Sequence, residues 1–349
     1  MAIACQFTST GIGSVPFMDV EGTCKSILEK CPEIPFWPQF VRRSPLEDMS
    51  IQASQGLPMI KLNHEGDSLY LDSSDNQDDE LISFYERYMA EDTDYFAIDY
   101  EHASGLYTLL ELIDKRPQDY GSYIKGQIVG PITFAGGLID GAGRSALTNS
   151  EIMDAIVKGL AIKAWWLVKT MSIGGKKPIL FIDEPYLSGY GSAFTPLQRE
   201  GVVSCIKEII DYLRSRCEVT LGIHCCGNTD WSMIIETGID IVSFDASDYL
   251  DYFLLYRKDI IRLLQNGGAV AWGVVPTASF SGDETVRDLQ ARLEEGLERF
   301  YAWGLDRDMV AERSLLTPAC GVGSIEPSRA ERIFELLSGL SAAMTPLGV

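Results

Sequence analysis

The sequence predicts an α/β fold, a single (β/α)8 TIM barrel, from three observations. The chain has 349 residues, of which 46% are hydrophobic, and α/β barrels of this length are commonly single domains. Short apolar runs rich in β-forming residues alternate with helical stretches, which is the pattern of repeated βα units. Polar or reactive residues follow several of these runs, at the rim where a barrel carries its active site.

Eight apolar runs are the predicted barrel strands. Most are continuous rather than alternating, which is typical of parallel strands covered on both faces. In chain order they span Ser9–Ser14, Asp94–Tyr100, Lys125–Pro131, Pro178–Asp183, Val219–Cys225, Asp240–Asp245, Ala269–Val275 and Ser314–Ala319. Helical patterns lie between them, for example at Ser150–Ser172 and Glu284–Trp303.

One stretch, residues 32–92, does not follow this alternation. It begins with the proline-rich string PEIPFWPQF and continues with LPMIKLNHEGDSLYLD, which is typical of a hairpin. We predict that residues 1–349 form one barrel domain. Residues 32–92 are then an insertion after the first strand that caps the barrel mouth.

Composition excludes several classes of partner. Fifty acidic residues against 29 basic ones give a formal charge of −21, which argues against nucleic acid and anionic membranes as partners. No apolar run approaches the roughly 20 residues of a membrane span. The N-terminus lacks the basic and apolar regions of a secretory signal. We therefore expect a cytoplasmic protein whose eight cysteines do not form a disulfide framework.

A histidine and two cysteines carry the strongest functional signal. His224 and Cys226 stand at the end of the fifth predicted strand, and Cys320 follows the eighth. Because side chains alternate along a strand, His224 and Cys226 should point one way and Cys225 the other. An imidazole and two thiolates are soft donors that fill three corners of a tetrahedral zinc site. The alternative is that these residues are ordinary members of a buried core.

Asp245, at the end of the sixth predicted strand, is a candidate for a fourth, exchangeable ligand. Alternatively it caps a helix or supports His224. Zinc that is rich in thiolate ligands suits the binding of a substrate thiol, whose pKa it lowers, better than it suits hydrolysis. The ligand set therefore points to alkyl transfer onto sulfur.

A glycine turn near the first strand suits an amino-acid substrate. The backbone amides of Ile12, Gly13 and Ser14 could receive a carboxylate. The alternative is that this segment is only a turn.

Acidic residues follow the second and fourth predicted strands. Asp183 and Glu184 are the candidate catalytic acids, and one of them could bind an α-ammonium group, as could Glu101. Acids at such a rim can also be simple helix caps.

The motifs, taken in order, resemble the C-terminal catalytic half of cobalamin-independent methionine synthases. That family has I-G-S at the first strand, G-P-[VI]-T at the third, I-D-E-P at the fourth, H-x-C at the fifth, an acid at the sixth and C-G at the eighth. Here they read Ile12–Ser14, Gly130–Thr133, Ile182–Pro185, His224–Cys226, Asp245 and Cys320-Gly321. The resemblance implies a zinc-dependent methyltransferase of methionine biosynthesis. In that family the I-G-S turn, Asp183 and Glu101 would bind homocysteine.

The departures from the family concern folate. A pteridine-stacking Trp is expected after G-P-[VI]-T, where this chain has Phe134–Gly137. A folate-contacting Glu is expected after I-D-E-P, where it has Gly189, and a proton-donating His on the seventh-strand loop, where it has Trp272–Pro276. The acid of the sixth strand is Asp245 instead of the usual Glu. This pattern resembles the short, core-type methionine synthases.

The resemblance implies that the methyl donor is methylcobalamin on a corrinoid protein rather than methyl-folate. A methyl group on cobalt needs no acid to protonate its leaving group. The expected cofactors are one zinc per chain and a corrinoid that is not tightly bound. Two alternatives remain: another zinc-dependent thiol alkyltransferase, such as the coenzyme M type, or a zinc or corrinoid-protein binding module without catalysis.

Overall fold

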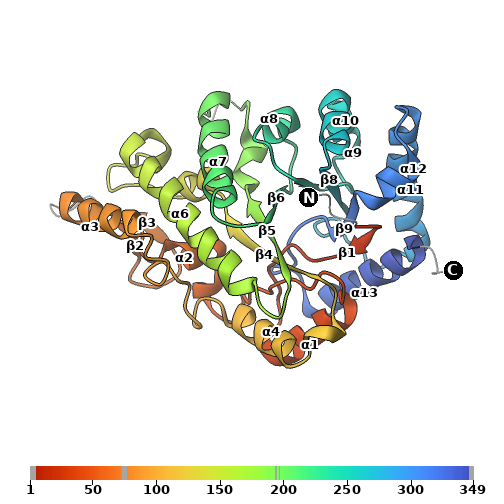
Figure 1. Cartoon of the computed structure of the whole chain (residues 1–349), viewed down its shortest axis with the longest axis horizontal. Coiled ribbons are helices and arrows are strands. Elements are labelled where there is room, and N and C mark those ends of the chain that lie inside the picture. The colour runs from red at the N-terminus through yellow and green to blue at the C-terminus, as the bar shows by residue number, and fades with distance from the viewer. Residues whose placement is uncertain (1–4, 73–76, 193–194, 196, 346–349) are drawn as a thin grey trace.

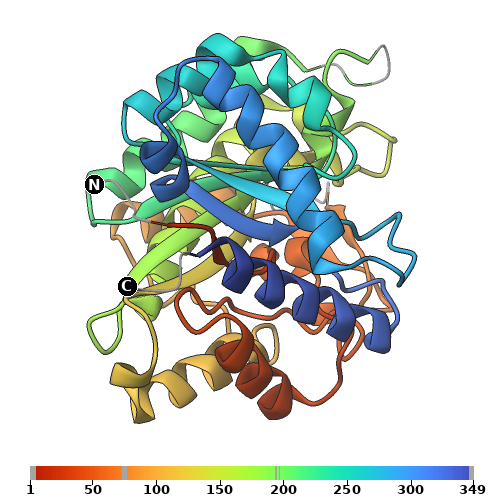
Figure 2. The same ribbon diagram turned by 90° about the vertical axis from the view of Figure 1, so that its right-hand side faces the viewer.

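The computed structural model describes residues 5–72, 77–192, 195 and 197–345. These residues form an α/β fold in which helices surround a curled parallel sheet (Figures 1 and 2). Within the described residues the sheet has seven strands in the order β1-β9-β8-β7-β6-β5-β4. They are β1 Thr8–Ser9, β4 Tyr123–Val129, β5 Lys177–Asp183, β6 Thr220–Cys225, β7 Ile241–Phe244, β8 Ala269–Val275 and β9 Ser314–Pro318.

Helices connect the strands and cover the outside of the sheet (Figure 2). They are α1 Val20–Lys30, α2 Met49–Ser54, α3 Gln77–Met89, α4 Ser104–Lys115, α5 Pro131–Gly136, α6 Ser150–Met171, α7 Arg199–Arg214, α8 Trp231–Glu236, α9 Leu250–Leu254, α10 Arg257–Gln265, α11 Val286–Ala302, α12 Arg307–Glu312 and α13 Pro327–Met344. Short 3-10 helices are η1 Pro45–Glu47, η2 Pro117–Asp119, η3 Ala146–Thr148 and η4 Pro185–Gly189. No helix of the described residues combines the length and apolar character needed to cross a membrane.

Strands β5, β7, β8 and β9 separate two apolar layers. Phe181 of β5 and Leu315 of β9 belong to a small cluster made mainly of strand residues. Their neighbours Leu180 and Leu316 belong to the large cluster that the strands share with the helices. Consecutive side chains therefore face opposite sides of the sheet, as strand geometry requires, and the small cluster fills the inside of the curl.

Six of the eight predicted strands are present in the described part of the chain, and the first, Ser9–Ser14, overlaps β1 only at Ser9. The exception is Asp94–Tyr100, where no strand forms. The carbonyl of Phe96 accepts a hydrogen bond of 2.8 Å from Lys163 Nζ of α6. The carbonyl of Ile98 accepts one of 2.7 Å from the Tyr107 hydroxyl of α4. Side chains of helices thus take backbone acceptors that a strand would offer to the sheet.

Residues 35–39 occupy the position between β1 and β4 instead. The Trp37 N–H donates to the Lys125 carbonyl of β4 at 2.9 Å, and the Gln39 N–H donates to the Gly13 carbonyl after β1 at 3.0 Å. Isolated parallel bridges accompany these bonds on both sides. Residues 35–39, which lie within the predicted insertion, therefore bridge the two edges of the sheet.

Prolines explain why this connection is not a regular strand. Pro35 and Pro38 have no N–H, so residues 35–39 cannot continue a ladder of hydrogen bonds on either side. The proline-rich composition, which argues against a regular strand, is therefore compatible with an irregular strand at residues 35–39. At this point the curled sheet is linked by isolated bridges. It is therefore not the regular eight-stranded barrel that we predicted.

The remainder of the predicted insertion contains the expected hairpin. Strands β2 Ile60–Leu62 and β3 Leu69–Leu71 pair antiparallel, and helix α3 packs against α6. Residues 73–76 lie outside the described residues. A capping role for this segment at the barrel mouth stays a prediction.

The close packing of α4 on residues 35–39 gives a stability prediction. A Cβ added at Gly105 would overlap the carbonyl oxygen of Pro38, and neither backbone can yield easily. Gly105→Ala should therefore lower the free energy of unfolding by about 1–3 kcal/mol, measured by urea denaturation. Gly201→Ala is the matched control, because a Cβ at this helical position meets no atom within 4 Å. Equal stabilities of the two variants would contradict the packing.

Candidate metal centre

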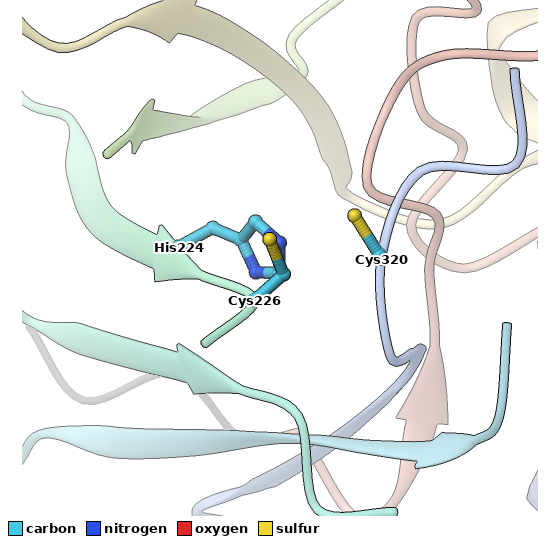
Figure 3. A group of neighbouring side chains, drawn as sticks. All are labelled: His224, Cys226 and Cys320. Atoms are coloured by element: carbon cyan, nitrogen blue, oxygen red, sulfur yellow. The ribbon is translucent and has the colours of Figure 1, made fainter. Parts of the chain in front are cut away.

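Three soft donor atoms meet at the carboxyl ends of β6 and β9 (Figure 3). A ring nitrogen of His224 and the sulfurs of Cys226 and Cys320 lie within 4.8 Å of one another. His224 is buried, with 3% of its surface exposed, whereas both cysteines are half-buried. The imidazole of the group is therefore more deeply buried than its two cysteine residues.

Cys225 faces away from this group, as strand alternation predicts. It is fully buried and belongs to the large cluster shared with the helices. Burial raises the pKa of its thiol to about 12. Cys225 is therefore a core residue, and the H-x-C spacing places only the first and third residues together.

The two cysteine thiols shift each other's pKa in opposite directions. The Cys320 thiol, as a hydrogen-bond donor, and the neighbouring His224 lower the pKa of Cys226. The same interaction with Cys226 raises the pKa of Cys320. A divalent metal, which binds thiolates rather than thiols, would neutralise the charge of both sulfurs.

The imidazole is also arranged for a ligand. His224 Nδ1 lies 3.0 Å from Ser243 Oγ of β7. Its Nε2 is buried and has no hydrogen-bond partner among the residues that the structure describes. A buried nitrogen without a partner is costly, and coordination to a metal would satisfy it. One nitrogen and two sulfurs are a donor set that fits zinc.

Asp245 is not a member of this group. Its Oδ1 accepts hydrogen bonds from the Ser247 N–H at 2.8 Å, the Ser247 hydroxyl at 2.7 Å and the Asp248 N–H at 3.0 Å. These contacts support the alternative that Asp245 caps the turn after β7. The hydrogen-bond partner of His224 is instead Ser243, which lies on β7 two residues before Asp245.

Asp183 lies beside the group, because it is the register partner of His224 between β5 and β6. Its side chain is buried, and Oδ1 has no hydrogen-bond partner within the described part of the chain. Burial raises the pKa of Asp183, and the charge of Lys125 opposes this increase. Asp183 therefore presents a free carboxylate oxygen in the interior of the sheet.

Lys125 is an interior residue that sequence reasoning missed. It is fully buried on β4, lies over the Phe181 ring at 4.7 Å from the centroid, and donates to Gln127 Oε1 at 3.0 Å. Its ammonium also donates to the Ile12 carbonyl. The signal was a lysine and a glutamine two residues apart in the apolar run YIKGQIV. Alternation would have placed both on the inner face.

Glu184, the other predicted catalytic acid, caps helix α5. It accepts hydrogen bonds from the Ile132 N–H at 2.9 Å, the Thr133 N–H at 2.8 Å and the Thr133 hydroxyl at 2.6 Å. A Cβ at Gly130 would overlap its carboxylate. Burial raises the pKa of Glu184 to about 7. The G-P-I-T and I-D-E-P motifs thus meet for a structural reason, and the assignment of Glu184 to catalysis is not supported.

The I-G-S turn lies against the loop that carries Cys320. The Val322 N–H donates to the Ser14 carbonyl at 2.9 Å, and the Gly323 N–H to the Ser14 hydroxyl at 3.3 Å. Within the described residues, the backbone N–H groups of residues 11–14 have no hydrogen-bond acceptor. The turn that contains Ile12 and Gly13 therefore keeps donors available for an anion.

Glu101 is exposed on a turn after residues 94–100. Because no strand forms there, the geometric reason for placing Glu101 at the rim of the sheet is absent. The neighbouring Asp99 and His102 pair with each other at 2.7 Å. A role of Glu101 in substrate binding rests on the sequence resemblance alone.

Comparisons with known proteins agree with the fold. The chain is similar to the structure of a B12-independent methionine synthase from Shewanella sp. W3-18-1 in complex with selenomethionine, with a TM-score of 0.57 and 14% sequence identity. The alignment covers 97% of each chain. At this identity the likeness establishes a distantly related fold. No family model and no curated protein matches the chain.

Proposed function

We propose that this chain is a zinc-dependent methyltransferase that converts homocysteine to methionine. The observation that carries the proposal is the convergence of the donor atoms of His224, Cys226 and Cys320 within 4.8 Å, with both cysteine residues only half-buried. The similar structure of a methionine synthase supports this class of activity. The sequence motifs support the choice of substrate.

His224 and the sulfurs of Cys226 and Cys320 would hold the metal, because their donor atoms lie within 4.8 Å of one another. Nε2 is the proposed nitrogen ligand, since it has no hydrogen-bond partner among the described residues. Zinc in such a site lowers the pKa of an added thiol, so that the thiol is a thiolate nucleophile at neutral pH. The half-buried cysteines leave a side from which a substrate sulfur can approach.

The remaining groups of an amino-acid thiol have matching partners. Asp183 offers its free Oδ1 to the α-ammonium group. The N–H groups of residues 11–14 can donate to the α-carboxylate. Both lie next to the proposed ligands, since Asp183 is paired in register with His224 and the turn contacts the loop after Cys320. These contacts favour an α-amino acid over a simple alkyl thiol.

The proposed methyl donor is methylcobalamin, free or on a corrinoid protein. The sulfur–methyl bond forms while the cobalt–carbon bond breaks, and its electron pair stays on cobalt. No proton has to reach the leaving group. This suits a chain whose other histidines are His64, exposed on the β2–β3 turn, and His102, which is paired with Asp99. The similar structure is that of a B12-independent enzyme, so on this point our proposal departs from it.

One observation favours a second candidate, a thiol alkyltransferase of the coenzyme M type. Lys125 places a buried cation in the interior near Asp183, and a sulfonate needs such a cation. However, the ammonium is already bonded to the Ile12 carbonyl and to Gln127. We therefore rank homocysteine first.

The decisive assay supplies zinc-loaded protein with methylcobalamin and either homocysteine or coenzyme M, and detects the methylated thiol by mass spectrometry. We expect methionine from homocysteine, no methylated coenzyme M, and no product from metal-free protein. Product from coenzyme M alone would favour the second candidate. Zinc binding without any product would indicate a binding module.

Asp183→Asn should raise the KM for homocysteine by about 10- to 100-fold, which corresponds to the ~1.5–3 kcal/mol of a hydrogen bond to a charged group. The zinc content should not change, because Asp183 is outside the ligand group. Steady-state kinetics and zinc analysis measure the two effects. An unchanged KM, or a loss of zinc, would assign Asp183 a different role.

A further inference from the structure

Ser243 is the residue of β7 that faces His224. The two are register partners between β6 and β7, and Ser243 Oγ lies 3.0 Å from His224 Nδ1. Ser243 is fully buried. It is the one polar side chain in the strand Ile-Val-Ser-Phe. A buried hydroxyl costs free energy unless it is hydrogen-bonded, and His224 is the partner that the structure provides.

This contact distinguishes the two ring nitrogens. Nδ1 faces Ser243, whereas Nε2 has no partner within the described part of the chain. A neutral imidazole that binds a metal through one nitrogen carries its proton on the other. If Nε2 binds the metal, Nδ1 must carry the proton, and Ser243 Oγ can accept its hydrogen bond. The register of two strands thus sets the direction of the metal-binding lone pair.

The hydroxyl suits both states of the centre. A hydroxyl can rotate, so it can donate to Nδ1 when Nε2 is protonated and accept from Nδ1 when Nε2 binds a metal. A carboxylate at this position could only accept. It would also add a third negative charge beside Cys226 and Cys320. Serine therefore orients the ring without competing for the cation.

We propose that Ser243 is a positioning residue of the metal centre, which holds His224 so that Nε2 is the nitrogen ligand. This inference rests on the proposed metal site. It adds the residue that selects the ligand atom. Loss of a partner that orients a metal-binding histidine typically costs about 10- to 100-fold in metal affinity.

The first test measures zinc affinity by competition with a chromophoric chelator. Ser243→Ala should raise the zinc Kd by about 10- to 100-fold, and Ser243→Thr, which keeps the hydroxyl, should restore most of the affinity. Ser314→Ala is the matched control. It also removes a buried hydroxyl of a strand residue, but that hydroxyl bonds Trp272 Nε1 and the Val310 carbonyl. Unchanged affinity in Ser243→Ala overturns the proposal.

A double-mutant cycle separates positioning from general destabilisation. In a His224→Cys background three sulfur donors remain, and Ser243 has no imidazole to orient. Ser243→Ala should then change the zinc Kd less than about twofold, since the coupling of the pair is lost. An equal loss of affinity in both backgrounds would mean that Ser243 acts through stability alone, and would also overturn the proposal.

Nitrogen-15 NMR on histidine-labelled, zinc-loaded protein reads the ligand atom directly, and the chain has only three histidines. We expect Nε2 of His224 to be bound and Nδ1 to be protonated. A metal on Nδ1 contradicts the inference. None of these measurements depends on turnover. Zinc binding through Nε2 without methyl transfer would disprove the proposed activity and leave the role of Ser243 intact.

Discussion

Cys226→Ser is expected to remove zinc and methyl transfer together, whereas Cys225→Ser should retain both. A serine hydroxyl is a poor substitute for a thiolate ligand, because it is neutral at pH 7 and not a soft donor. Loss of an outer-shell partner already costs about 10- to 100-fold in metal affinity, so loss of a ligand should exceed ~100-fold. Activity should fall to the level of metal-free protein.

These two variants can be compared directly, because Cys225 and Cys226 are adjacent in the sequence and their side chains point in opposite directions. Cys225 is packed in the large apolar cluster, so Cys225→Ser should cost about 1–3 kcal/mol of stability through a buried hydroxyl. Zinc must therefore be measured per folded molecule, by metal analysis after gel filtration. If both variants lose the same fraction of zinc, the alternation of side chains along β6 does not explain the site.

Turnover should require methylcobalamin and fail with methyltetrahydrofolate. A general acid is typically worth about 10²–10⁴-fold in rate, and a folate nitrogen leaves only when it is protonated. Neither His64 nor His102 lies on the loop after β8, where the methionine synthases that this sequence resembles are expected to carry a proton donor. We expect methionine formation from folate at least ~10²-fold below that from methylcobalamin.

Both donors should be compared at equal concentration with the same zinc-loaded preparation. Methionine is quantified over time, and a folate-dependent methionine synthase serves as a positive control for the folate stock. Efficient turnover of methyltetrahydrofolate with none of methylcobalamin would show that another group of this chain supplies the proton. The donor assignment would then be wrong, although the zinc and homocysteine assignments would stand.

Local patterns were enough to predict most strands and the three metal-binding candidates. A strand has a period of two, so the string IHCC determines by itself that His224 and Cys226 share a face and that Cys225 does not. Parallel strands in a curled sheet bring their carboxyl ends to one rim. This is why Cys320, far along the chain, could be assigned to the same site.

Sequence patterns were least informative where long-range contacts decide the outcome. Residues 94–100 have the composition of a strand, but side chains from α4 and α6 take two of their carbonyl groups. Glu184 looks like a rim acid in sequence, yet the start of α5 folds back to meet it. Neither contact has a local signature. At residues 35–39 the proline-rich composition gave no indication that the segment would bridge the sheet.

The loop after β9 has a consequence for how the molecule is made. It brings Cys320 to His224 and Cys226, and its N–H groups bind Ser14, near the other end of the chain. A growing polypeptide presents Ser14 and the histidine–cysteine pair long before Cys320 is synthesised. The complete set of proposed ligands thus exists only after β9 has docked between β1 and β8. Tight zinc binding would then be possible only in a chain that is fully synthesised and whose sheet has closed. Incomplete chains would release their metal.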